Sequence, residues 1–88
     1  MIPTLIRPIN GGIQKLYMFD NGYGASVVQH RYSYGNESGL WELAVTRYEP
    51  SSEVLDFELC YDTPITEDFI GGLTHEGVQD ILTKIESL

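Results

Sequence analysis

The feature that most constrains the fold is an alternation of apolar and polar residues in the stretch from Phe19 to Tyr61. The alternation is clearest in residues 41–46 (WELAVT) and residues 55–62 (LDFELCYD). Successive side chains of a strand face opposite sides of a sheet, so each run predicts a strand with one buried and one exposed side. The residues predicted to be buried are Trp41, Leu43, Val45, Leu55, Phe57, Leu59 and Tyr61. Those predicted to be exposed are Glu42, Ala44, Thr46, Asp56, Glu58, Cys60 and Asp62.

A third run, residues 27–34 (VVQHRYSY), predicts another strand with less regular sides. We expect its aromatic side to face the core and Val27 to face outward. The aromatic side consists of Val28, His30, Tyr32 and Tyr34. The links at residues 35–39 (GNESG) and 49–53 (EPSSE) are rich in residues that accept turn geometry. Such short links predict that consecutive strands are antiparallel neighbours.

The N-terminal residues 1–12 (MIPTLIRPINGG) predict an extended arm or an edge strand. Pro3 and Pro8 prevent a continuous helix and remove hydrogen-bond donors from a strand. A strand over residues 13–20 follows. Asn21-Gly22 is then a typical hairpin turn, because both residues tolerate a positive φ.

The C-terminal residues 74–87 predict a helix that begins after Thr74 as its N-cap. Apolar residues recur at i, i+3, i+4 and i+7, so they form one stripe along the helix. This stripe consists of Val78, Ile81, Leu82 and Ile85, and we expect it to pack on the buried face of the sheet. Residues 66–71 (TEDFIG) predict one further helical turn.

Together these elements predict an α+β fold for residues 1–88 as a single domain. An extended arm (1–12) precedes an antiparallel β-meander of about four strands in residues 13–61, and the C-terminal helix (74–87) packs on one face. A chain of this length can bury one modest core. A single helix covers only one face of such a sheet, so the opposite face is open to solvent or to a partner. That face is predicted to carry Glu42, Asp56, Glu58, Ala25 and Val27.

The chain has 13 acidic and 5 basic residues and a formal net charge of −8. Nucleic acids are bound by clustered Lys and Arg, whereas the basic residues here are scattered, so direct nucleic-acid binding is not expected. An anionic membrane would be repelled for the same reason. No stretch reaches transmembrane length or has the pattern of a signal peptide. We therefore expect a protein of the cytoplasm that does not bind membranes.

The sequence has no catalytic or metal-binding pattern. Asp56, Glu58 and Asp62 would supply oxygen ligands for a hard cation, but carboxylates on an exposed strand side commonly serve solubility, so neither a metal nor a cofactor is predicted. Neither histidine has a partner suggested by spacing, and the G-x-S-x-G motif is absent. Cys60 is the single cysteine, which excludes an internal disulfide. We therefore do not expect an enzyme.

Two groups of residues are candidates for a contact surface with another protein. The first group is acidic and consists of Glu42, Asp56 and Glu58 on exposed strand sides. The second is aromatic and consists of Tyr23 and Tyr48, which lie near turns. Tyr and Trp are favoured among the residues that dominate protein interfaces.

Four segments, in this order, resemble a group of uncharacterised small proteins encoded by tailed bacteriophages. They are FDNGYGASVV (Phe19–Val28), SYG (Ser33–Gly35), GLWELAV (Gly39–Val45) and YDTPIT (Tyr61–Thr66), and a short closing helix follows them. The resemblance covers the chain from Phe19 onward and leaves the N-terminal arm outside. It implies a phage origin and a site of action in the host cytoplasm, and it implies no catalytic residues.

These observations lead us to expect a small non-enzymatic protein that binds a host or phage protein. Inhibition of a host defence or of a nucleic-acid-processing enzyme is one expected outcome, because an acidic surface competes for a basic cleft by charge complementarity. A structural or assembly homodimer, joined through the open face or the arm, is the alternative. An enzyme acting on small molecules would need a pocket that the sequence does not reveal.

Overall fold

The computed structural model describes residues 1–33, 35–65 and 69–88. Within these residues the elements are β1 (Leu5–Ile9), β2 (Gly12–Met18), β3 (Tyr23–Gln29), the short 3-10 helix η1 (Asn36–Ser38), β4 (Trp41–Arg47), β5 (Glu58–Leu59), β6 (Ile70–Leu73) and α1 (His75–Glu86). The predicted α+β class is confirmed: one helix packs on an antiparallel sheet. The sheet of the described residues has six strands, more than the four expected.

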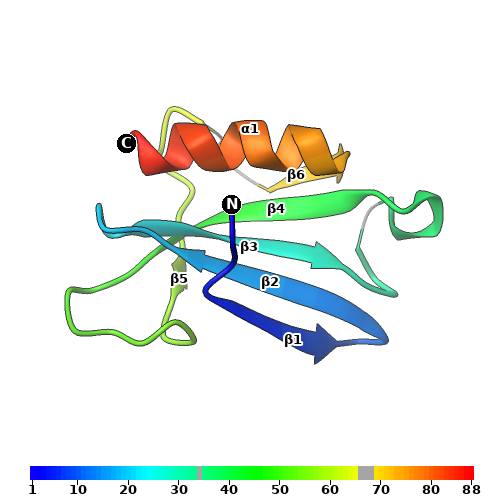
Figure 1. Ribbon diagram of the computed structural model, residues 1–88, viewed down its shortest axis with the longest axis horizontal. Helices are drawn as coiled ribbons and strands as arrows, with labels where there is room; N and C mark the ends of the chain where they lie inside the picture. Colours follow the sequence, from blue (N-terminus) through cyan, green and yellow to red (C-terminus); the bar gives the residue numbers. More distant parts are fainter. Residues whose placement is uncertain (34, 66–68) are drawn as a thin grey trace.

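The sheet is a meander in which consecutive strands are neighbours, in the order β1-β2-β3-β4-β5. β4 pairs with β3 on one side and with both β5 and β6 on the other. Thr46 and Arg47 pair with β5, whereas Trp41 and Leu43 pair with β6 at the other end of β4. The helix α1 lies across one face of this sheet (Figure 1), in contact with β3, β4 and β6.

Two hairpins connect the first three strands, and both depend on left-handed backbone at the turn. Between β1 and β2, Asn10 and Gly11 have φ values of 47° and 78°, the geometry that matches the twist of two directly connected strands. The N-terminal arm is thus an edge strand paired along β2. The predicted turn at Asn21-Gly22 is confirmed, although only Gly22 takes a positive φ, of 85°.

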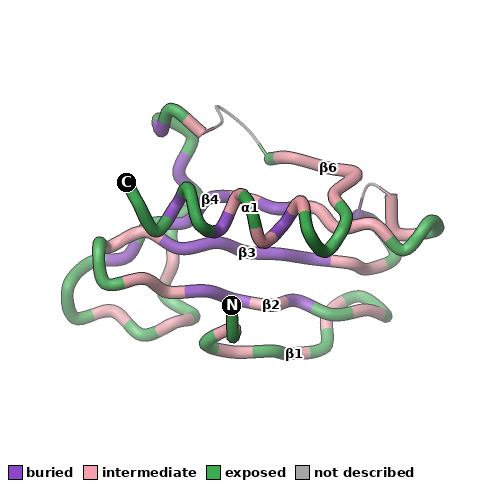
Figure 2. The backbone as a smooth tube through the Cα atoms, turned by 45° about the horizontal axis from the view of Figure 1, so that its top comes forward, coloured by how far each residue is buried: buried purple, intermediate pink, exposed green. Residues whose placement is uncertain are grey.

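The main core lies between α1 and the sheet. Its buried residues are Tyr17, Ala25, Val27, Leu43, Val45, Cys60, Val78, Leu82 and Ile85. The predicted helix is confirmed, and Thr74 caps it by accepting a hydrogen bond from the Gly77 N–H at 3.1 Å. Buried stretches of β3 and β4 run beneath the helix, whereas β1 at the edge has none (Figure 2).

The predicted orientation of the third run was wrong. Val27 and Ala25 face the core under α1, not the open side. β3 ends at Gln29, and Tyr32 lies in the turn that follows, with 73% of its surface exposed. The Ser33 hydroxyl accepts a hydrogen bond from the His30 N–H and stabilises this turn. Tyr32 therefore lies beyond the end of the strand and does not belong to either of its sides. Tyr34 lies outside the described residues.

The predicted orientation of residues 55–62 was also wrong. Leu59 and Tyr61 are 50% and 46% exposed, whereas Cys60 is buried in the core. The reason is the register of β5, which places Leu59 opposite Thr46, a residue that points away from α1. Leu55, also predicted to be buried, lies outside the short β5 and is half exposed.

The helical turn predicted for residues 66–71 is contradicted where the structure describes it. Residues 66–68 lie outside the described part of the chain. Ile70 and Gly71 belong to β6, which pairs with β4 across a bulge. Pairing with a strand distant in sequence therefore outweighs the local signal for a helix.

The helix stripe provides a test of the core. Leu82 is fully buried, so Leu82→Ala should lower the free energy of unfolding by about 2–5 kcal/mol, through lost burial and the cavity left behind. Thr83→Ala, on the exposed side of the same helix, should change it by less than about 0.5 kcal/mol. Urea unfolding followed by circular dichroism measures both. Equal effects of the two substitutions would contradict the packing of α1 on the sheet.

The Asn21 side chain joins the second hairpin to the end of α1. Its Nδ2 donates to the carbonyl oxygens of Ile85 and Glu86 at 2.9 and 3.1 Å, and its Oδ1 accepts from the Tyr23 N–H at 3.0 Å. The last carbonyls of a helix have no partner within the helix, so this amide satisfies groups that the helix leaves open.

Asn21→Ala should therefore lower the free energy of unfolding by about 1–2 kcal/mol. Asn21→Asp keeps the acceptor for Tyr23 but places a negative charge at the helix C-terminus, so it should be at least as destabilising. Asp20→Ala, at the exposed neighbouring position, is the control. Thermal unfolding of all three variants checks the ranking, and a harmless Asn21→Asp would contradict the capping role.

Candidate functional site

We call the face of the sheet opposite α1 the outer face. It is formed by the strand residues whose side chains point away from the core. In the central strands it presents Gln14 from β2, Ser26 and Val28 from β3, and Glu42 and Ala44 from β4. These residues alternate with the core residues of the same strands. The outer face is thus fixed by the strands that hold the core.

Part of the outer face is covered by the segment between β4 and β5, which lies on the opposite side of the sheet from α1 (Figure 1). The ring of Phe57 packs edge-on against Tyr48, with centroids 6.4 Å apart, and the Tyr48 hydroxyl donates to the Val54 carbonyl at 2.9 Å. Gly24 makes room for the Tyr48 ring, because a Cβ there would lie 2.9 Å from Tyr48 Cε2. This packing buries Tyr48 and raises the pKa of its hydroxyl through desolvation.

The uncovered part of the outer face is hollowed. A hollow of about 290 Å³ has Gln14, Ser26, Val28 and Ala44 in its floor and Leu59, Tyr61 and Phe69 among its walls. A second hollow, of about 480 Å³, shares Glu42 and Phe69 with the first and extends to Arg31 and Tyr32. We call the two hollows together the outer groove.

Large apolar side chains are exposed around the outer groove. Leu59, Tyr61 and Phe69 are each about half exposed, at 50%, 46% and 51%, and Tyr32 is 73% exposed. Leu59, Tyr61 and Phe69 come from segments that are far apart in the sequence and that the pairing of β4 with β5 and β6 brings together. Exposed apolar residues that gather over a hollow and have a polar rim mark interaction sites in folded proteins.

The floor of the outer groove contains a buried polar chain. Arg7 Nε donates to Gln14 Oε1 at 2.6 Å, and Gln14 Nε2 donates to Ser26 Oγ at 2.9 Å. Gln14 and Ser26 are 5% and 8% exposed. At the other end of the groove, His30 Nδ1 accepts from the Tyr32 N–H at 3.1 Å.

The acidic residues predicted for the contact surface do not form one cluster. Glu42 lines the outer groove. Asp56 accepts from the Glu53 N–H within the loop before β5, and Glu58 lies opposite Arg47 in the pairing of β4 with β5. Of the three predicted acidic residues, Glu42 is therefore the one that lines the outer groove.

The aromatic residues predicted for the contact surface also lie elsewhere. Tyr23 is half-buried against the core on the α1 side, and Tyr48 is buried. Sequence reasoning missed Leu59, Tyr61 and Phe69, because it assigned the first two to the core and the third to a helical turn. The alternation in residues 55–62 did place Leu59 and Tyr61 on the same side of the strand. It assigned that side to the core, whereas the side with Cys60 faces the core.

The carboxylates considered as metal ligands are not gathered. In the part of the chain that the structure describes, no group of three or more His, Cys, Asp and Glu side chains is arranged to hold a metal ion. Asp62 instead accepts a hydrogen bond from the buried Cys60 thiol, with Sγ and Oδ1 2.9 Å apart. None of the described helices is long and apolar enough to cross a membrane.

The Cys60–Asp62 contact should be visible in thiol reactivity. Burial and then the hydrogen bond to Asp62 raise the pKa of the Cys60 thiol, whereas this hydrogen bond lowers the pKa of Asp62. The thiolate is the reactive form, so labelling by iodoacetamide at neutral pH should be slow and should accelerate as the pH rises. Stability should fall in the same alkaline range, because the unfolded chain releases the thiol proton more readily.

Asp62→Ala removes one cause of the raised pKa, so it should speed labelling of the folded protein at a fixed pH. Glu58→Ala, an exposed carboxylate in the same strand region, is the control. Labelling of the native protein as fast as that of the urea-unfolded chain would contradict the buried thiol.

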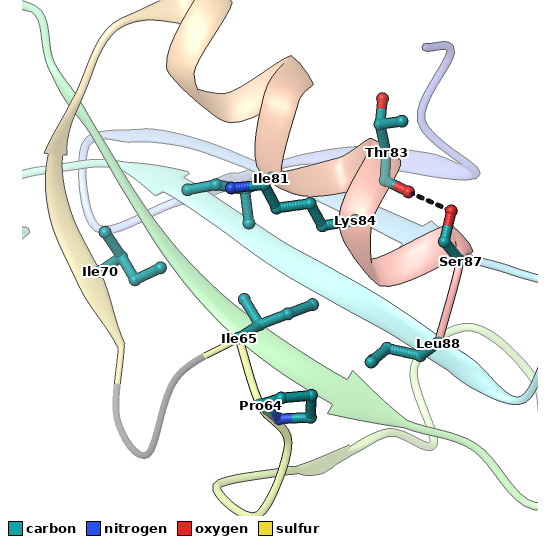
Figure 3. A pocket seen from close by; sticks show the side chains of 8 residues that line it. All are labelled: Pro64, Ile65, Ile70, Ile81, Thr83, Lys84, Ser87 and Leu88. Carbon is teal, nitrogen blue, oxygen red and sulfur yellow. Dashed lines mark hydrogen bonds between the residues drawn. The ribbon is translucent and has the colours of Figure 1, made fainter.

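A further cleft, of about 550 Å³, lies between the C-terminal half of α1 and the segment before β6 (Figure 3). Its lining is mainly apolar, with Ile65, Ile70 and Ile81 directed into it and Lys84 as the charged residue among the described lining. The Ser87 hydroxyl, which also lines the cleft, donates a hydrogen bond to the Thr83 carbonyl.

The outer groove combines exposed apolar side chains with a floor that contains a buried polar chain. No protein-family model, no curated protein and no solved structure matches the chain.

Proposed function

We propose that this protein is a small non-enzymatic binding module that docks a basic, partly apolar segment of another protein in the outer groove. The observation that carries the proposal is the exposure of Leu59, Tyr61 and Phe69 around a hollow whose floor is formed by strands. Burying such side chains against a partner removes apolar area from water, which is the main driving force of association.

The charge of the chain favours a basic partner. The net charge is −8, and Glu42 lines the groove. Complementary charge speeds the encounter and suppresses wrong partners. A second copy of this chain would bring the same negative charge and be repelled, so a different protein fits better than a homodimer.

The biological setting of the proposal comes from the resemblance of residues 19–66 to small proteins of tailed bacteriophages. In that setting the partner is a host or phage protein in the host cytoplasm. Binding that covers a basic cleft would inhibit a host defence or a nucleic-acid-processing enzyme, which is a form of host takeover. The acidic chain supports competition for such a cleft and not direct contact with nucleic acid.

A peptide selection tests the proposal. The immobilised protein would be presented with a displayed library of random peptides, and we expect enrichment of sequences that combine apolar residues with Lys or Arg. Leu59→Lys should weaken binding of the enriched peptides by about tenfold or more, which is about 1.4 kcal/mol. Ile6→Lys is the matched control, because Ile6 is an exposed aliphatic residue in β1, at 57%, and does not line the groove.

The affinities would be measured by fluorescence anisotropy with synthetic peptides, after circular dichroism has shown that both variants fold. Absence of enriched peptides, or an equal loss in both variants, would contradict the proposal. Sedimentation that shows a dimer of the wild type, disrupted by Leu59→Lys, would replace the foreign partner by a second copy.

A further inference from the structure

The hydroxyl of Ser26 stands at the centre of the groove floor. Ser26 lies in β3, opposite Leu16 of β2 and Ala44 of β4. It is 92% buried by its own chain, as its exposure of 8% shows, and it lines the hollow enclosed by the exposed apolar walls. Its two cross-strand neighbours are therefore apolar. The Ser26 hydroxyl has a polar neighbour on one side only, where Gln14 lies.

The polar side is Gln14, and the direction of the hydrogen bond there is fixed. The Arg7 guanidinium can only donate, so the Gln14 oxygen must face Arg7, as it does at 2.6 Å. The Gln14 amide nitrogen then faces Ser26 and donates to Ser26 Oγ at 2.9 Å. Ser26 is thus an acceptor in this contact, and its own proton is left for another partner.

Within the described residues, Ser26 Oγ accepts this bond from Gln14 and donates none that the structure records. A buried donor without an acceptor costs free energy, and the cost is removed when a ligand supplies the acceptor. A second donor lines the same hollow: His30 accepts at Nδ1 from the Tyr32 N–H, so the proton of the neutral ring is at Nε2.

The acceptor that fits is a neutral carbonyl. A carboxylate or phosphate would be disfavoured by the net charge of −8. An extended peptide chain presents a main-chain carbonyl on the same side at every second residue. We propose that the occupant of the outer groove is an extended peptide segment and that Ser26 Oγ donates a hydrogen bond to one of its main-chain carbonyls; this inference rests on the proposed function.

The test uses synthetic peptides from the selection described above and compares three variants. Ser26→Ala removes the donor and should weaken binding about three- to tenfold, the range expected for one hydrogen bond. Ser26→Thr keeps a hydroxyl and should retain most of the affinity. Thr46→Val is the matched control, because Thr46 is a fully buried hydroxyl residue of the outer-facing set that does not line the hollow.

A second measurement separates a direct contact from a structural effect of Ser26. Replacing the peptide amides one at a time by esters weakens each carbonyl as an acceptor. At one position the ester should weaken binding to the wild type and have little further effect on Ser26→Ala, which is the non-additivity expected of two groups in contact.

The outcomes distinguish this inference from the function on which it rests. A library that yields no peptide overturns the proposed function. Enriched peptides that bind Ser26→Ala as tightly as the wild type overturn the role of Ser26 and leave the proposed function standing. If Ser26→Ala does not fold, the ester series on the wild type decides, and equal binding of all esters overturns the role of Ser26.

Discussion

The structure depends on the backbone pairing of β4. This strand is hydrogen-bonded to β3 along one side and to β5 and β6 along the other, so it holds together segments from both ends of the sequence. Its two faces serve different purposes: Leu43 and Val45 pack beneath α1, and Glu42 and Ala44 line the outer groove. A disturbance of β4 would therefore affect the core and the candidate site together.

The outer groove follows from the presence of one helix on a two-sided sheet. α1 covers one face, and the segment carrying Phe57 folds over only part of the other, where Tyr48 is buried. The rest is left with a floor of small and polar side chains and with apolar walls. The hollow exists because Ser26 and Ala44 are small. Its rim is apolar because Leu59 and Phe69 are each about half exposed there.

Most buried polar side chains of the described residues have a hydrogen-bond partner, and Thr46 Oγ1, which is buried without one, is the exception. Asn21 donates to a carbonyl at the C-terminus of α1, and Thr74 accepts from an N–H at its N-terminus. Asp62 accepts a hydrogen bond from the Cys60 thiol. Gln14 likewise accepts a hydrogen bond from Arg7 and donates one to Ser26. Because buried polar groups normally find partners, a hydroxyl that only accepts, at the base of a groove, is more informative than an exposed one.

The sequence by itself determined the elements whose signal is local. The stripe of Val78, Leu82 and Ile85 and the cap at Thr74 are sufficient for α1, and the alternation in residues 41–46 is sufficient for β4 and its buried side. Glycines that take a positive φ, such as Gly22, mark the hairpins for the same reason. From these elements the α+β class follows, because one amphipathic helix and a set of alternating strands have one way to bury their apolar faces.

Only the tertiary structure decided which side of a strand is buried when the local pattern allows both. Alternation sorts residues 55–62 into two sets but does not say which set meets the core; the register of Leu59 opposite Thr46 decides that, and a shift of one residue reverses every side chain. The strand at Ile70 exists because β4 offers it a partner, which no local signal contains. The walls of the outer groove depend on the register of β5 and on the pairing of β6 with β4. For this reason the sequence predicted Glu42 on this face but neither Leu59 nor Phe69.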